Sequence, residues 1–365
     1  QALRASDPKR ARDDLLAVVA QAPGYAPAYV LLAQAWKALG YDAKALASAQ
    51  QAAANSEGLP PRMQLSIERE VAAQQFDWSK AVELDGKLLT LSPQDLDQQL
   101  ALADDLLNAG RPDEAERALA DVRKLPGGDS DPRVELKAVA VARLRGNIAD
   151  QAAHAERALQ LAQAHDTALL AARAKVELAW TQSHSGQQEA AEKMLRDVID
   201  YYQQRGNLRD EAEARLRLAG VLTKQNRSRQ AREQYQTALD VFHRIGDQKQ
   251  LTNTYKLLNG ALWNQGDRDG AVTASRRGLA IAREIRDAGS EAWHSGSLAV
   301  MRLDEGADDE TIAELRAASE LDGRLGARED RLFMLANLSD AYRLRGQLDE
   351  AQKYCSLARA ELSPT

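Results

Sequence analysis

Apolar and small residues recur along the second half of the chain at a constant interval of 40 residues. One series of leucines comprises Leu178, Leu218, Leu258, Leu298 and Leu338. A turn-forming series follows eight positions later, with Gly186, Asn226, Gly266, Gly306 and Gly346. A small-residue series lies five positions beyond that, with Ala191, Ala231, Ala271, Thr311 and Ala351. Three series in the same phase predict a structural repeat.

Each repeat has the pattern of a helix pair. Leu178 and Ala179 supply the packing stripe of a first helix, and Gly186 marks the turn. Ala191, Leu195 and Val198 follow at the spacing of one face of a second helix. A small residue on the second helix allows close approach of the two helices. Because each pair leaves one face uncovered, neighbouring pairs are expected to stack.

The first half repeats at a shorter interval. Its turn residues Gly40, Phe76, Gly110 and Gly146 lie 36, 34 and 36 positions apart. Their small-residue series is Ala45, Ala81 and Ala115, with Gln151 at the fourth place. We therefore expect about nine helix pairs, preceded by an unpaired second helix near residues 8–22. The change of interval predicts two sub-regions, 1–162 with repeats of 34–36 residues and 163–365 with repeats of 40 residues.

These residues resemble the tetratricopeptide repeat (TPR). Its pattern is matched by Tyr29, Leu32, Ala33, Trp36, Gly40, Ala45, Ala49 and Ala52, and again by Leu335, Leu338, Ser339, Tyr342, Gly346, Ala351, Cys355 and Ala358. The resemblance implies an all-α, right-handed superhelical TPR solenoid of about nine helix-turn-helix repeats. Gln151, Asn259 and the Glu68-Arg69 pair depart from the pattern, and altered packing is expected there.

A more specific resemblance concerns the first half of the chain. The strings at 59–62, 77–81, 109–111, 125–126 and 131–133, followed by 40-residue repeats, look like the C-terminal repeat regions of bacterial membrane-anchored serine/threonine kinases and winged-helix transcriptional regulators. This resemblance implies a sensor or docking region on the periplasmic side, with a transmembrane helix and an output domain upstream of Gln1. A stand-alone cytoplasmic scaffold for protein partners is the alternative.

Composition narrows the function further. Charged residues make up 28% of the chain, the formal net charge is −6, and the two signs alternate along the sequence, which disfavours nucleic acid as a partner. Cys355 is the single cysteine, so no internal disulfide forms. A run of about 18 apolar residues, as a membrane span requires, does not occur. The oligomeric state stays open.

Motifs for catalysis are not found. The phosphate loop, the dinucleotide-binding glycines and the zinc-protease motif are absent. His184 beside Ser183 and His294 beside Ser295 are the nearest candidates for a nucleophile and base, but adjacent helical residues point about 100° apart. We therefore expect no enzyme activity, no catalytic residues, no metal and no cofactor. A hydrolase or transferase accessory with a site hidden in the groove is the third hypothesis.

The TPR resemblance implies that first helices line a concave groove that binds a protein or peptide. The groove positions selected in this way include Trp180, Lys256, Trp263, Trp293, Phe333 and Arg343. Aromatic rings are favoured anchors for binding, so replacing Trp263 and Trp293 by alanine is expected to weaken binding while helicity is retained. Gly260 replaces the asparagine expected four residues after Lys256 in chaperone-binding repeats. A chaperone tail is therefore not expected as the ligand.

Overall fold

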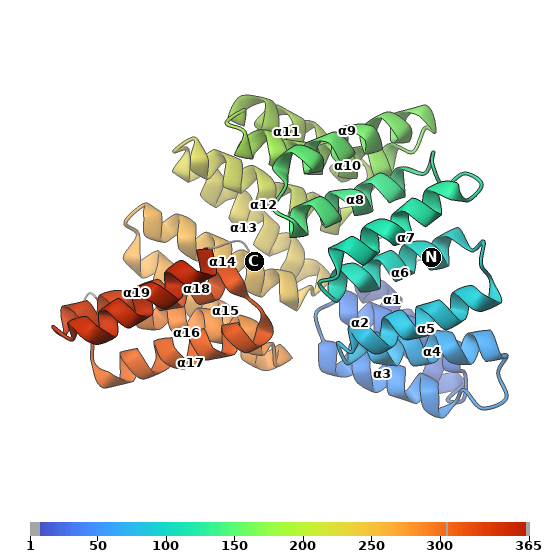
Figure 1. Cartoon of the computed structure of the whole chain (residues 1–365), viewed down its shortest axis with the longest axis horizontal. Coiled ribbons are helices and arrows are strands. Elements are labelled where there is room, and N and C mark those ends of the chain that lie inside the picture. Colours follow the sequence, from blue (N-terminus) through green and yellow to red (C-terminus); the bar gives the residue numbers. More distant parts are fainter. Residues whose placement is uncertain (1–7, 304–305, 363–365) are drawn as a thin grey trace. The chain divides into compact units, whose positions relative to one another are not determined.

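The computed structural model describes residues 8–303 and 306–362, which form 19 α-helices and no strand (Figure 1). The chain divides into two compact units, one ending at Gly246 and one beginning at Asp247. Short turns connect most of the helices, as expected of stacked pairs. These observations confirm the predicted all-α repeat fold.

The helices of the first unit are α1 (Pro8–Gln21), α2 (Ala26–Ala38), α3 (Asp42–Ala54), α4 (Pro61–Gln74), α5 (Trp78–Leu91), α6 (Leu96–Asn108), α7 (Pro112–Lys124), α8 (Pro132–Leu144), α9 (Ile148–Ala164), α10 (Ala168–His184), α11 (Gln188–Arg205), α12 (Leu208–Lys224) and α13 (Ser228–Ile245). Those of the second unit are α14 (Gln248–Asn264), α15 (Arg268–Ile285), α16 (Ala288–Arg302), α17 (Asp309–Leu325), α18 (Arg328–Leu344) and α19 (Leu348–Leu362). Within the described residues, α1 precedes nine pairs, in which the even-numbered helix is the first helix.

The predicted turn residues adopt a backbone conformation that ends a helix. Gly186, Asn226 and Gly266 have φ of +83°, +57° and +76°, in the left-handed region that glycine and asparagine tolerate best. A further series of positive-φ residues joins each second helix to the next pair, and the sequence analysis did not identify it. Its members are Asp166, Gly206, Gly246, Arg286 and Gly326, again 40 residues apart.

Close helix packing depends on the small-residue series, as expected. Ala191, Ala231, Ala271 and Thr311 are all 0% exposed, because each lies where a second helix contacts its neighbours. In the leucine series, Leu298 is only half-buried. The turn after α16 differs from the others, since Gly306 has φ of +138°.

Helix length follows the repeat length. Helices α2 to α8 contain 13 or 14 residues, whereas α9 to α18 contain 15 to 18. The longer helices begin with α9, close to the expected change of interval at residue 162. The division into compact units falls after Gly246, and the two predicted sub-regions stay a prediction.

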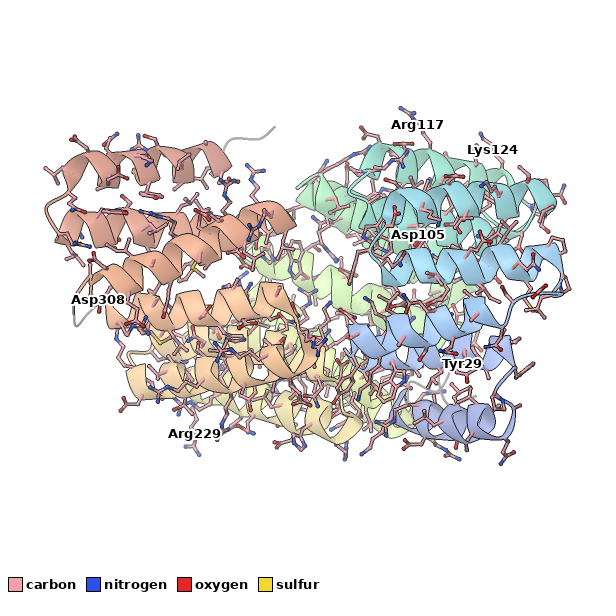
Figure 2. All side chains as sticks on the ribbon, turned by 90° about the horizontal axis from the view of Figure 1, so that it is seen from below. Tyr29, Asp105, Arg117, Lys124, Arg229 and Asp308 are labelled. Atoms are coloured by element: carbon pink, nitrogen blue, oxygen red, sulfur yellow. The ribbon has the colours of Figure 1, made fainter. Side chains whose placement is uncertain are left out.

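One departure from the repeat pattern forms a buried charged cluster. Arg69 of α4 lies between Asp85 of α5 and Asp105 of α6, with its Nη2 2.6 Å from Asp105 Oδ1 and its Nε 3.5 Å from Asp85 Oδ1. Gln98 Nε2 donates to Asp85 Oδ1 at 2.8 Å. Figure 2 shows Asp105 among the helices, whereas Arg117 of α7 projects from the surface. Arg69 therefore replaces apolar packing with polar contacts across three helices.

Asn259, a second departure from the repeat pattern, also forms polar contacts in the interior. Asn259 is 4% exposed and donates its amide hydrogens to Ala271 O at 3.0 Å and to Ser275 Oγ at 2.9 Å. Ser297 Oγ donates to Asn259 Oδ1 at 3.4 Å. The buried amide is thus satisfied by α15 and α16, and the expected alteration of packing takes the form of hydrogen bonds.

Substituting Ala231 with tryptophan tests the helix register. Ala231 is fully buried, so the larger ring overpacks the contact between second and first helices and destabilises the array by roughly 1–3 kcal/mol. Urea unfolding followed by circular dichroism measures the loss. Arg229→Trp is the control, because the Arg229 side chain projects into solvent two residues away on α13 (Figure 2). Equal stability of the two variants would contradict the register.

Asp85 makes stability depend on pH. The pKa of Asp85 is raised from 3.8 to about 7, chiefly by burial; Arg69 opposes the rise and the nearby Asp105 adds to it. A carboxyl group with a raised pKa contributes stability that is present below about pH 4 and is lost as the pH rises to about 7. Asp85→Asn imitates the protonated acid at every pH. Urea unfolding between about pH 5 and pH 8 should show this loss in the wild type and not in the variant, and parallel profiles would contradict the assignment.

Candidate functional site

An open cavity of about 890 Å³ lies against the first helices of four consecutive pairs in the first unit. Helices α6, α8, α10 and α12 supply nearly all of its lining. The same repeat positions recur on each helix when counted back from the turn residues Gly110, Gly146, Gly186 and Asn226. The cavity therefore follows the repeat, in the way expected of a groove lined by first helices.

Apolar residues form a continuous stripe along this wall. Ten residues before each turn residue stand Leu100, Leu136, Val176 and Leu216. Leu100, Leu136 and Val176 line the cavity directly, and Leu216 is 8% exposed. The stripe offers apolar contacts at regular intervals to any chain that lies along it.

Charged residues flank the stripe and pair between neighbouring first helices. Arg133 Nη1 lies 2.8 Å from Asp97 Oδ1, and Arg173 Nη2 lies 3.5 Å from Asp210 Oδ2. Two further ion pairs join consecutive helices in the same way, Lys137 with Asp104 and Arg143 with Glu177. Each pair is partly exposed and adds little stability by itself. Together they neutralise most of the wall charge.

Trp180 belongs to α10, one of the helices that line the cavity, but is not itself a lining residue. It occupies the repeat position of Asp104 and Ala140, which line the cavity, and its ring is half-buried. The Trp180 ring stacks on His184 with ring centres 3.9 Å apart, and His184 Nδ1 lies 2.8 Å from Trp180 O. The guanidinium carbon of Arg143 is 5.9 Å from the ring centre. Trp180 is thus held in place by its own helix and by α8.

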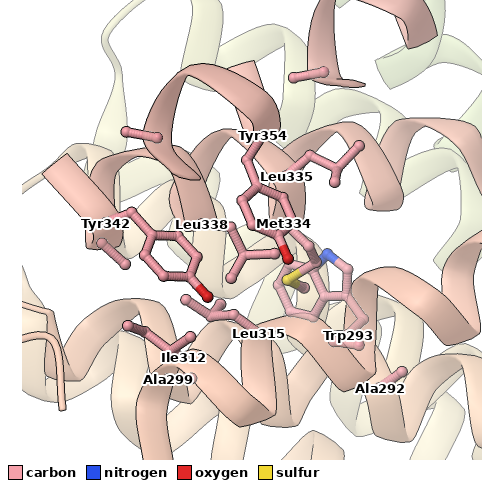
Figure 3. Packing of buried hydrophobic residues seen from close by; sticks show 14 residues of the cluster. Ala292, Trp293, Ala299, Ile312, Leu315, Met334, Leu335, Leu338, Tyr342 and Tyr354 are labelled. Atoms are coloured by element: carbon pink, nitrogen blue, oxygen red, sulfur yellow. The ribbon is translucent and has the colours of Figure 1, made fainter. Parts of the chain in front are cut away.

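Lys256 and Trp293 come together in the second unit. Both line a cavity of about 290 Å³, and Lys256 Nζ lies 5.1 Å from the Trp293 ring centre and 2.5 Å from Asp330 Oδ1. Trp293 is only 8% exposed and packs with Met334 and Leu338 in the cluster of Figure 3. Packing of the fold is therefore a main role of this ring.

Three other predicted groove residues are separate from these cavities. Trp263 is half-buried beneath Arg268, whose guanidinium carbon lies 3.4 Å from the ring centre. Phe333 is 40% exposed, and Arg343 Nε lies 3.2 Å from Asp340 Oδ1 at the surface. None of the three lines the 890 Å³ or the 290 Å³ cavity. Their participation in binding stays a prediction.

The cavity-lining residues of α6 and α8 were not among the predicted site residues. Asp97, Arg133 and Lys137 belong to the shorter repeats, whereas the groove positions had been assigned only in the 40-residue repeats. Counting the same positions back from Gly110 and Gly146 would have identified Asp97 and Arg133, but not Lys137, which lies one residue after the groove position of Leu136.

The histidine and serine neighbours do not contact each other. Ser295 Oγ donates to Glu291 O at 2.8 Å, and Ser183 Oγ donates to Gln188 Oε1 at 2.9 Å. His294 is 1% exposed, and its burial lowers its pKa to about 4. In residues 8–303 and 306–362, no group of three or more histidine, cysteine or acidic side chains is placed to hold a metal ion. Every described helix is too short or too polar for a membrane span.

Comparisons with known proteins identify the fold. No family model and no curated protein matches the chain. A Rap protein complexed with Competence and Sporulation Factor is 12% identical, with a TM-score of 0.60 over 92% of this chain and 97% of that one. Aspartyl phosphate phosphatase F from Bacillus subtilis is 11% identical, with a TM-score of 0.57 over 93% and 94%. The apo form of RapI is 14% identical, with a TM-score of 0.52 over 83% and 99%.

These likenesses confirm a TPR-like helical repeat fold. The identities are too low to transfer an activity, a ligand or a partner. One of the three proteins is named a phosphatase, so the expectation that this chain is not an enzyme stays a prediction. The resemblance to kinase and regulator repeat regions also stays a prediction.

Trp293 and Trp263 should differ in their effect on stability. Trp293→Ala removes a buried ring from the cluster of the second unit and should cost about 3–5 kcal/mol, as in other large-to-small core substitutions. Trp263→Ala should cost clearly less, because that ring is half-exposed. Urea unfolding of both variants measures the difference, and equal losses would contradict the assignment. Replacing both Trp263 and Trp293 by alanine is therefore expected to lower stability as well as binding, a cost that the sequence pattern did not indicate.

Proposed function

We propose that this chain is a TPR-type interaction module that binds an extended peptide segment of another protein along the first helices of its first unit. The supporting observation is the cavity of about 890 Å³ whose wall is formed by α6, α8, α10 and α12. Its size is within the range of ligand-binding clefts, about 300–1,000 Å³. Because equivalent positions recur on each helix of the wall, the cavity suits an extended peptide, whose residues also recur at regular intervals.

The chemistry of the wall supports a peptide rather than a nucleic acid. A polyanion requires a basic surface, but Arg133, Lys137 and Arg173, which line this cavity, each pair with a carboxylate on a neighbouring first helix. The apolar stripe suits hydrophobic side chains of a bound segment, and the flanking ion pairs can exchange partners with its polar groups. A Rap protein of the same fold was solved with Competence and Sporulation Factor, which supports binding by such arrays.

The proposal extends to signalling. Because each repeat contacts mainly its neighbours, a ligand that spans four repeats would change their relative rotation, and small rotations add up along an array. The resemblance of the first half to bacterial sensor regions favours relay of this change to an attached kinase or winged-helix output domain, with the array in the periplasm. A stand-alone cytoplasmic scaffold, which holds partners without relay, is the alternative.

Blocking the cavity tests the binding function. Ala140 lines the cavity from α8, so Ala140→Trp should fill part of it and weaken peptide binding at least about ten-fold. The probes are dodecapeptides selected from a random display library on the wild-type chain and measured by fluorescence polarisation.

Ala153→Trp is the matched control. Ala153 is exposed on α9, the second helix of the same pair, and this variant should bind as the wild type does. Thermal unfolding of both variants checks that the fold is retained. Full binding by a folded Ala140→Trp variant, or a selection that yields no binding peptide, would contradict the proposed function.

A further inference from the structure

Arg217 continues the charged wall of the first unit at its α12 end. It lies four residues after Glu213, a cavity-lining residue, and so shares that face of the helix. Counted from the turn residues, it occupies the same repeat position as Lys137 of α8 and Glu177 of α10, both of which line the cavity. The side chain is exposed to solvent.

Arg217 differs from the other cations of this wall because it has no partner. In the part of the chain that the structure describes, its guanidinium makes no hydrogen bond and no ion pair. Arg133, Lys137, Arg143 and Arg173 each pair with a carboxylate on a neighbouring first helix. The wall thus contains an unpaired donor group with five N–H bonds available.

The acidic groups closest to Arg217 are already engaged. Glu177 pairs with Arg143, and Glu213 Oε1 lies 3.4 Å from Arg209 Nε. Although the side chain is exposed, partial desolvation by neighbouring groups lowers the pKa of Arg217. Glu177 and Glu213 oppose the effect in part, whereas Arg143 adds to it. The positive charge of the Arg217 guanidinium is therefore only partly balanced by the carboxylates of the protein.

Space for a ligand lies beside it. Gly220 follows Arg217 by three residues in the middle of α12, and a Cβ at Gly220 would meet no atom within 4 Å. Glycine inside a helix destabilises it relative to alanine, and no contact within the described chain requires glycine here. Gly220 has the repeat position of Trp180 on α10, so the backbone of α12 is open next to the wall that bears this ring.

We propose that Arg217 binds a carboxylate of the peptide segment, beside the open backbone at Gly220. This inference rests on the proposed function and specifies its ligand as an acidic segment. A planar guanidinium binds a carboxylate through two parallel hydrogen bonds, and such charge-assisted pairs are stronger than neutral ones. The carboxylate belongs either to an aspartate or glutamate side chain or to the peptide C-terminus.

The test uses the dodecapeptides selected on the wild-type chain. Each peptide is compared with a twin in which its acidic residues are replaced by the corresponding amides, and with a second twin that carries a C-terminal amide. The protein variants are Arg217→Met, which removes the charge at similar length, and Arg229→Met as control. Arg229 is exposed on α13, where its Nε lies 3.3 Å from Glu233 Oε1, away from the first helices.

We expect the selected peptides to be rich in acidic residues and to lose at least about ten-fold in affinity in one of the two twins. The twin that loses affinity identifies the source of the carboxylate. Arg217→Met should bind the parent peptide and that twin equally, whereas Arg229→Met should retain the full difference. Thermal unfolding should show Arg217→Met to be as stable as the wild type, because the substitution removes an unpaired charge.

Two results would overturn the inference while the proposed function stands. Peptides could bind the cavity, as shown by the effect of Ala140→Trp, without any preference for a carboxylate. Alternatively, the preference could persist undiminished in Arg217→Met. A selection that yields no binding peptide would overturn both proposals, since the second depends on the first.

Discussion

The structure depends on close contact between helix pairs through small side chains. Ala191, Ala231, Ala271 and Thr311 leave no space to solvent, and any larger residue there would separate the helices. A helix pair alone cannot cover its apolar face, so its stability comes from the pairs stacked on either side. The same stacking places the first helices next to one another, and the cavity of the first unit is a consequence of it.

The repeat architecture could be predicted because its determinants are local. Gly186, Asn226 and Gly266 mark turns since few other residues tolerate a positive φ, and alanine at a fixed distance marks the contact of two helices. The second series of turns, from Asp166 to Gly326, has the same interval but mixes glycine with aspartate and arginine. Arg286 in particular adopts φ of +59°, and because arginine does not favour this conformation, the residue type does not predict the turn.

The candidate site could be predicted only in part, because it depends on which side chains meet across repeats. Trp180 was predicted from its repeat position; it lies on α10, which lines the cavity, but is not itself a lining residue, so its participation in binding stays a prediction. Trp293 was predicted by the same rule, but its ring packs in the core of the second unit. The cluster of Arg69, Asp85 and Asp105 joins residues from three helices, and no local pattern predicts which charges become buried together.

The ion pairs of the cavity wall also restrict how such an array can evolve. Asp97 pairs with Arg133, Asp104 with Lys137 and Glu177 with Arg143 across repeat boundaries. The charge changes sign between Asp97 and Arg133, and between Lys137 and Glu177, which occupy equivalent positions in consecutive repeats. A duplication of the repeat that carries Asp97 would therefore place two aspartates opposite each other on the inner wall. The repeats share one helix-pair backbone, but the charges on their first helices differ, so the repeats cannot be interchanged freely.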